Sequence, residues 1–211
     1  MYKSFLSFLF VGVLAASVTG CSKDDAQDAI DGTKNVADDP ELLGTYSGEC
    51  AGAGFIQAGV QDTYKFEGNS FTRIQTFYSD NTCASDSKLG EIKYDGEFKV
   101  DSDSDVVTNG GAVDITLQSA NLNISNQTLA DLLNTIQFCG RNDYGIGAEF
   151  PLEGSATDDI GCPVETVPST RYGAYTVDDG KLFLNRDAIK GMSVKEDERP
   201  TEVLKEQALT K

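Results

Sequence analysis

The sequence predicts an all-β domain over residues 42–211, built as an antiparallel barrel or a sandwich. Short stretches of this region alternate large apolar residues with polar ones, the period of two that is expected of half-buried strands. Tight turns rich in Gly, Asn and Asp separate these stretches, and regular short strands joined by such turns are typical of antiparallel sheets. Once the N-terminal segment is set aside, the remaining length suits one domain with a core of its own.

Six stretches are predicted to contain strands. Large apolar residues alternate with polar ones in Tyr64–Phe66 and again in Phe71–Phe77. These stretches are LLGTYSGEC (42–50), DTYKFEG (62–68), SFTRIQTFYSD (70–80), EIKYDGEFKVD (91–101), GAVDITLQSA (111–120) and AYTVDDGKLFLN (174–185), and further strands are expected. EGNS at 67–70 and DDGK at 178–181 have the residues of hairpin turns, and Asp95-Gly96 indicates a further turn or a bulge.

Segment 125–138 has the period of a helix instead. Its large apolar residues are Leu129, Leu132, Leu133 and Ile136. Spacings of three and four residues place them on one helix face, and Ser125 or Asn126 can cap the start. We expect one amphipathic helix packed against the β-domain, although a helix that binds a partner in a groove would show the same pattern.

The composition excludes several classes of function. The formal net charge is −17, from 34 acidic and 17 basic residues, and an acidic surface repels nucleic-acid phosphates, so we expect no nucleic-acid partner. Histidine is absent, which excludes Ser-His-Asp and Cys-His catalysis and histidine-ligated zinc or iron. A nucleophile elbow and a glycine-rich phosphate loop are also missing. The sequence therefore predicts no enzyme activity and no cofactor.

The first 20 residues have the pattern of a targeting segment. Lys3 supplies a basic start, and Phe5–Val18 is an apolar run somewhat short for a membrane span. An uncleaved transmembrane anchor is the alternative. It is disfavoured because SKDDAQDAID follows at once, without the basic residues that flank a span on its cytoplasmic side.

The end of this segment resembles the lipobox of bacterial lipoprotein signal peptides, which is an aliphatic residue, a small one, Gly or Ala, and then Cys. The matching residues are Val18, Thr19, Gly20 and Cys21. The resemblance implies a signal peptide at 1–20, a lipid on the sulfur of Cys21, and cleavage just before that residue. Ser22 at the next position implies sorting to the outer membrane of the bacterial cell envelope.

Residues 21–41 connect the predicted lipid anchor to the β-domain. They are acidic and short of large apolar residues, so they cannot bury enough surface to fold. We expect a disordered tether, and about 20 random-coil residues span on the order of 25 Å.

Four cysteines remain once Cys21 is assigned to a lipid: Cys50, Cys83, Cys139 and Cys162. An exported domain tends to pair its cysteines, and four cysteines allow three connectivities. We favour Cys50–Cys83 and Cys139–Cys162; the first pair would join the end of the first strand to the turn after the second hairpin. A four-cysteine zinc site is the alternative, but no two of these cysteines stand two to four residues apart.

A calcium site is the other metal hypothesis, because DSDSD places Asp101, Asp103 and Asp105 close together. An EF-hand loop would need Gly and Glu where the chain has Val106 and Ala112, so that motif fails. A solvated loop is the competing interpretation.

Several segments resemble a group of small bacterial lipoproteins with a lipocalin-like β-barrel. They are LLGTYSGEC, YKFEGNSFTRIQTFYSDNTC, GAYTVDDGKLFLN and ERPTEVLKEQALTK. Gly44-Thr45-Tyr46 is similar to the G-x-W signature that opens lipocalin barrels. The resemblance implies an antiparallel lipocalin-like β-barrel, in which Arg199 would be the late arginine that stacks on Tyr46. It implies no particular ligand.

Two functions then compete for an envelope lipoprotein of this kind. The barrel could bind a small apolar or amphipathic ligand, as eight-stranded barrels can. Alternatively, its own side chains fill it, and the protein has a structural role or contacts other envelope proteins. The positions that separate these functions are Tyr64, Phe66, Phe71, Phe77, Phe98 and Leu182. If these side chains fill the interior, the case for a ligand weakens.

Overall fold

The computed structural model describes residues 41–53, 58–101, 106–107, 110–152, 167–185, 192–203 and 208–211. All of them belong to one compact unit, Gly32–Lys211. The predicted signal peptide and all but the last residue of the predicted tether lie outside the described residues, so both stay predictions.

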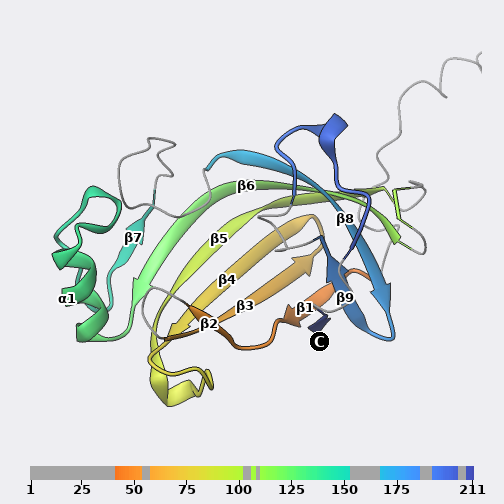
Figure 1. The fold of residues 1–211 in the computed structure, drawn as a ribbon. Coiled ribbons are helices and arrows are strands. Elements are labelled where there is room, and N and C mark those ends of the chain that lie inside the picture. The colour runs from red at the N-terminus through yellow and green to blue at the C-terminus, as the bar shows by residue number, and fades with distance from the viewer. Residues whose placement is uncertain are drawn as a thin grey trace, which may run out of the picture. The chain divides into compact units, whose positions relative to one another are not determined.

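Eight antiparallel strands close into a barrel (Figure 1). They are β1 (Gly44–Ser47), β3 (Ala58–Glu67), β4 (Ser70–Tyr78), β5 (Lys88–Asp101), β6 (Gly110–Ile124), β8 (Ser169–Asp178), β9 (Lys181–Leu184) and β10 (Leu209–Thr210). Each strand pairs with the next in this series, and the ring closes because β1 pairs with both β3 and β10. The predicted all-β, lipocalin-like antiparallel barrel is therefore confirmed.

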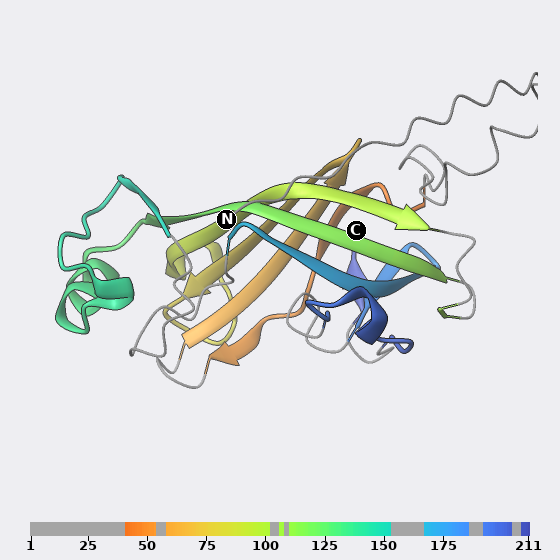
Figure 2. The same ribbon diagram turned by 90° about the horizontal axis from the view of Figure 1, so that it is seen from above.

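Two short strands add to the barrel wall. β2 (Ala51–Ala53) continues the course of β1 along β3, and β7 (Glu149–Pro151) pairs with the last part of β6. The helix α1 (Gln127–Thr135) follows β6. It lies at the end of the barrel opposite the β3–β4 hairpin (Figures 1 and 2). We call these two ends of the barrel the helix end and the hairpin end.

The predicted turns form as expected. Glu67 pairs with Ser70 across the β3–β4 turn, where Gly68 adopts a φ of 57°. In the β8–β9 turn, Asp179 and Gly180 have φ values of 50° and 71°, the positive pair that matches the twist of a two-residue hairpin. Asp95-Gly96 is a bulge, at which the pairing of β5 with β6 shifts register.

The helix forms inside the predicted segment, but its buried face differs from the expected one. Asn126 caps it, since its side chain accepts a hydrogen bond of 2.8 Å from the Thr128 backbone N–H. Leu129 and Leu133 are buried, whereas Leu132 and Ile136 are 38% and 49% exposed. The expectation of one four-residue apolar face was wrong because Ile136 follows the last helical residue and the buried face is completed by the small residue Ala130.

In the part of the chain that the structure describes, no helix is both long and apolar enough to cross a membrane.

The core occupies the barrel interior. Residues that face each other across neighbouring strands point to the same side of the sheet, so the pairing assigns each side chain to the inner or the outer face. The innermost large side chains are at most 2% exposed: Tyr46, Tyr64, Phe66, Phe71, Phe98, Val113, Ile115, Leu117, Tyr175 and Leu182. Continuous burial across all these strands gives the barrel a single core.

Candidate functional site

Aromatic rings fill the hairpin end of the barrel. Phe66 lies at their centre, with ring centroids 4.9 Å from Phe98, 5.3 Å from Phe71 and 6.3 Å from Tyr46. All three contacts are edge-to-face, the arrangement that aromatic rings prefer. A side chain that lines a cavity exposes surface to the water inside it. Exposures of at most 2% therefore leave no room for a ligand beside these rings.

The side chains at the six positions that discriminate between the predicted functions are largely buried. Five of them, Tyr64, Phe66, Phe71, Phe98 and Leu182, are 0–2% exposed. The sixth, Phe77, is partly buried and packs against the core. Most of the interior is thus occupied by the protein's own side chains.

A charged cluster lies inside the barrel on β3 and β4. Arg73 is only 4% exposed, and its Nε donates a hydrogen bond of 2.9 Å to Oδ1 of Asp62. Its guanidinium carbon lies 5.8 Å from the ring centroid of Tyr64 and 5.4 Å from that of Tyr94. Both distances fall in the range of cation–π attraction. The arginine is therefore held by one carboxylate and two aromatic rings.

Arg73 stays protonated despite its burial. Loss of hydration lowers the pKa of its guanidinium, but charge interactions with Tyr64 and Asp62 and the hydrogen bond to Asp62 together raise that pKa above its usual value. Arg73 therefore carries its positive charge throughout the pH range in which proteins fold.

The inner face of the barrel has the opposite charge balance from the whole chain. The charged residues at inward positions of the eight strands are Asp62, Arg73 and Arg171. Arg171 is assigned inward because it faces Ile115, which is fully buried. Two arginines against one aspartate give this inner face one net positive charge, in a chain whose net charge is −17.

Towards the helix end, the inward side chains of β3 and β4 are not fully buried. Val60, Asp62, Gln75 and Phe77 are all intermediate in exposure. The Asp62 side chain is 27% exposed, and Gln75 Nε2 donates a long hydrogen bond of 3.4 Å to its Oδ1. The interior thus has a fully buried hairpin end and a polar, partly exposed stretch of β3 and β4.

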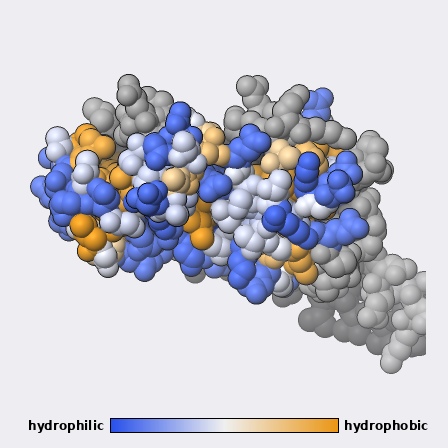
Figure 3. Space-filling view, turned by 90° about the horizontal axis from the view of Figure 1, so that it is seen from below, coloured by the Kyte–Doolittle hydropathy of each residue, from blue (hydrophilic) through white to orange (hydrophobic). Residues whose placement is uncertain are grey.

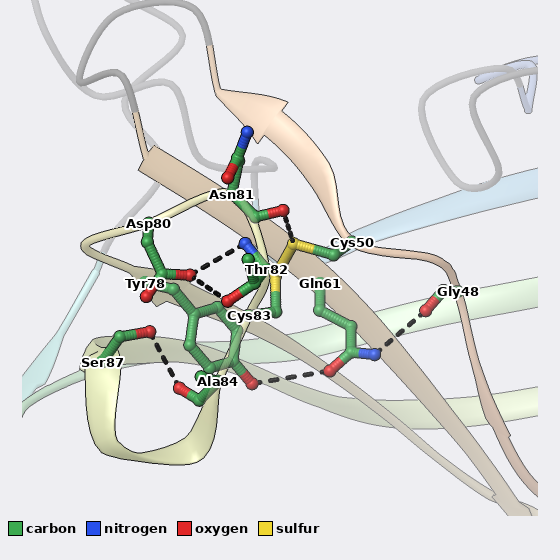
Figure 4. The surroundings of a disulfide bond; sticks show 10 residues. All are labelled: Gly48, Cys50, Gln61, Tyr78, Asp80, Asn81, Thr82, Cys83, Ala84 and Ser87. Atoms are coloured by element: carbon green, nitrogen blue, oxygen red, sulfur yellow. Dashed lines mark hydrogen bonds between the residues drawn. A yellow bond between two sulfur atoms is a disulfide. The ribbon is translucent and has the colours of Figure 1, made fainter.

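The predicted disulfide Cys50–Cys83 is present, with Cα atoms 5.8 Å apart. It joins the segment between β1 and β2 to the loop after β4 (Figure 4). In that loop, Asp80 Oδ1 accepts hydrogen bonds from the backbone and the hydroxyl of Thr82, and these bonds lower the pKa of Asp80. The disulfide and the loop thus pack on the outer face of β3 near the helix end.

Gly59 makes room for this disulfide. A Cβ at this position would lie 2.9 Å from both sulfur atoms and 2.3 Å from the carbonyl oxygen of Asp80. Such distances are far below van der Waals contact, so only glycine fits beneath the bridge without a shift of the loop.

The structure describes one cysteine of the second predicted disulfide. Cys139 lies in the turn after α1 and forms a disulfide. Cys162, its predicted partner, lies outside the described residues, so the pairing of these two cysteines stays a prediction.

Arg199 does not have the place that the lipocalin resemblance implies. It lies on the outer face of β6 and β8, where it donates hydrogen bonds to the carbonyls of Val113 and Gly173 and lies 5.4 Å from the ring centroid of Tyr172. The cation over Tyr46 is the ammonium group of Lys211, at 5.2 Å. The expectation was wrong because the ring of Tyr46 points into the barrel, on the other side of the wall from Arg199.

Tyr46 itself is a core residue. Its ring is fully buried, and its hydroxyl donates a hydrogen bond of 2.7 Å to the carbonyl oxygen of Glu41. The polar tip of this aromatic is thereby satisfied inside the protein, which makes it part of the packing at the hairpin end.

Most of the remaining predicted site residues lie outside the described part of the chain. Asp101 ends β5, but Asp103 and Asp105 lie outside the described residues, so the calcium hypothesis stays open. Among the side chains that the structure describes, no group of three or more acids and cysteines is placed to hold a metal ion. The lipobox residues Val18, Thr19, Gly20 and Cys21 also lie outside the described part of the chain.

The charged cluster of Asp62 and Arg73 was not predicted from the sequence, although the alternation of β4 indicates it. Phe71, Arg73, Gln75 and Phe77 stand two residues apart. Because successive side chains of a strand point to opposite faces, the inward phenylalanines at both ends place the arginine and the glutamine inside as well. A charged residue in phase with core aromatics therefore marks an interior polar site.

No model of a known protein family matches the sequence, and no curated protein is significantly similar to it. The lipoprotein resemblance therefore stays a prediction from sequence motifs. The fold and the interior of the barrel are what the structure adds to it.

Proposed function

We propose that this protein is a lipid-anchored lipoprotein of the bacterial envelope whose barrel is a packed, non-catalytic module that contacts other envelope proteins. The packed interior carries this proposal. Phe66, Phe71 and Phe98 fill the hairpin end, and burial of such rings stabilises a fold by about 1.5–3 kcal/mol each. A barrel built to carry a large apolar ligand would leave that space open.

The anchor is proposed from the lipobox. A lipid on Cys21 would hold the chain at a membrane without a spanning helix, since each buried CH₂ contributes about 0.8 kcal/mol and two or more acyl chains make a stable anchor. Ser22 favours the outer membrane.

The outer surface favours polar contacts with a partner. In the view of Figure 3, apolar side chains form small separate patches among hydrophilic ones. The exposed large hydrophobic residues of the described chain are Leu132, Ile136, Ile146 and Val194. Permanent complexes bury large apolar areas, so small patches on an acidic surface suit a reversible contact with a basic or polar face.

Binding of a small amphipathic ligand is the second candidate. The partly exposed inward side chains of β3 and β4 favour it, because they are the place where the interior of the barrel is not closed by its own packing. An eight-stranded barrel can hold one small ligand in such a space.

Anchoring is tested on the full chain in a Gram-negative host supplied with labelled palmitate. We expect the wild-type protein to incorporate the label and to fractionate with the membrane, and Cys21→Ala to lose the label and keep its leader. If Cys21→Ala left processing and fractionation unchanged, the anchor would be wrong.

The packed-barrel proposal is tested by native mass spectrometry of the detergent-purified lipoprotein. We expect the mass of the lipidated chain alone, together with a defined protein partner after cross-linking in cells. A stoichiometric small molecule that co-purifies without a covalent bond would instead favour the ligand-binding candidate.

A further inference from the structure

The guanidinium of Arg73 has unused hydrogen-bonding capacity inside the barrel. An arginine carries five N–H donors, and in this one Nε donates to Asp62. The two Nη atoms donate to no group in the described part of the chain. Neither Nη atom is among the fully buried side-chain atoms of the described residues that lack a partner. In a residue that is only 4% exposed, these N–H groups therefore keep a contact with solvent that a bound ligand can replace.

The surroundings of Arg73 hold its guanidinium in place. The rings of Tyr64 and Tyr94 lie at 5.8 Å and 5.4 Å from its central carbon, and Asp62 occupies the Nε atom. A fixed guanidinium with its Nη atoms free presents the planar fork that matches a carboxylate. Less freedom is lost on binding, because the fork is already held.

The electrostatic environment favours an anion at this place. Asp62 offsets the charge of Arg73, and Arg171 adds a second positive charge to the inner face. Besides Asp62, no carboxylate stands at an inward position of the eight strands. An anion beside Arg73 would therefore meet no second carboxylate of these strands.

The space beside Arg73 sets the size of the ligand. Val60 and Phe77 are inward, apolar and partly exposed on the same two strands. Phe77 stands four residues from Arg73, which is about 13 Å along a strand. Leu129 of α1 lies against Gly90 at the helix end of β5, where a Cβ would come within 2.9 Å of its side chain. The apolar stretch beside Arg73 is thus about 13 Å long, a length that matches a short molecule rather than a long acyl chain.

We propose that Arg73 binds the carboxylate of a short amphipathic molecule whose apolar part lies along Val60 and Phe77. This site goes beyond the anchored, packed module proposed above and gives the ligand-binding candidate a chemical class. Its failure would leave membrane anchoring and partner capture unchanged, so the two proposals fail separately.

The test uses the full lipidated chain in nanodiscs, with benzoate as the probe and benzamide as its neutral counterpart. We expect benzoate to shift the Nε–Hε resonance of Arg73 in ¹⁵N NMR spectra and to bind at least about tenfold more tightly than benzamide, a difference of about 1.4 kcal/mol. Equal affinity for both compounds, or an Arg73 resonance that benzoate does not move at saturation, would overturn the proposal.

Two variants sharpen the result. Arg73→Lys keeps the charge but removes the fork, and we expect calorimetry to show benzoate binding weakened about tenfold. Arg141→Lys is the matched control: Arg141 also stacks on a tyrosine, but its Nε and Nη2 already bind Asp143. An equal loss in both variants would contradict the site.

Asp62→Asn should have the opposite effect on the affinity for benzoate. It removes the negative charge beside Arg73 and keeps the shape, so benzoate should bind several-fold more tightly. Weaker or unchanged binding in this variant would count against the proposal even if Arg73→Lys failed to fold.

Discussion

Asp62 accepts a hydrogen bond of 2.9 Å from Nε of Arg73 between two neighbouring strands inside the barrel. The arginine is almost fully buried, whereas the carboxylate is 27% exposed. The aspartate therefore serves as the counter-charge of a cation that has left water, and its removal would leave Arg73 buried without its carboxylate partner.

We accordingly expect Asp62→Ala to destabilise the protein by about 1–3 kcal/mol, below the range for a fully buried pair because Asp62 still touches water. Urea unfolding followed by circular dichroism measures this difference. The exposed pair Lys65–Glu67 supplies the control, and Glu67→Ala should change stability by less than about 0.5 kcal/mol. Equal effects of the two variants would show that the interior pair has no special weight.

Gly59→Ala should destabilise the barrel through the disulfide that lies on this residue. The new methyl group would meet a backbone oxygen as well as both sulfur atoms, so the loop must move, and we expect a cost of about 1–3 kcal/mol. Gly52 is the control, since it pairs directly with Gly59 and a Cβ there meets nothing within 4 Å. Urea unfolding and the rate of disulfide reduction by a phosphine both report the effect, and a neutral Gly59→Ala would contradict this account.

The disulfide itself should contribute a larger share of stability. It closes a loop over a sequence separation of 33 residues, for which chain entropy predicts about 3–4 kcal/mol. The double variant Cys50→Ala, Cys83→Ala should lower the free energy of unfolding by that amount. Wild-type protein under reducing conditions should show a comparable loss, and a loss under about 1 kcal/mol would mean that the entropic account of this bridge fails.

Tyr144 should make the protein sensitive to alkaline pH. Burial raises the pKa of its phenol, an effect that Arg141 partly offsets, and the hydroxyl donates a hydrogen bond of 2.8 Å to the Phe138 carbonyl. Because the folded pKa lies above the unfolded value of about 10, the neutral phenol stabilises the fold fully below that value. This stabilisation is lost as pH rises through the folded pKa.

The measurement compares wild type with Tyr144→Phe in urea unfolding between neutral pH and pH 11. The free energy of unfolding should fall more steeply for wild type above about pH 10. Parallel curves would mean that Tyr144 does not titrate differently in the folded state.

Local patterns were sufficient for most of the barrel. Alternation in segments such as 62–68 and 70–80 reflects a half-buried strand directly, and Gly68 or Gly180 supplies the backbone freedom that a tight turn needs. The Cys50–Cys83 bridge could be favoured because it joins neighbouring parts of an expected meander.

Long-range features could not be predicted in the same way. β10 has only two residues, Leu209 and Thr210, and it is a strand because β9 and β1 pair with it on either side. Arg199 was misplaced because a short motif does not reveal which face of the wall a side chain reaches. Which face of α1 is buried depends on the barrel end against which it packs, and the spacing of its apolar residues does not predict this.

The closure of the barrel determines the order in which this chain can fold. Ser47 on β1 pairs with Thr210 on β10, 163 residues later. Pairings this distant form late, because the entropy of a long loop must be lost before the contact gains anything. One edge of the first strand therefore stays without its partner until residues near position 210 have been delivered. If the chain is exported as proposed, the barrel can close only after nearly the entire β-domain has crossed the membrane.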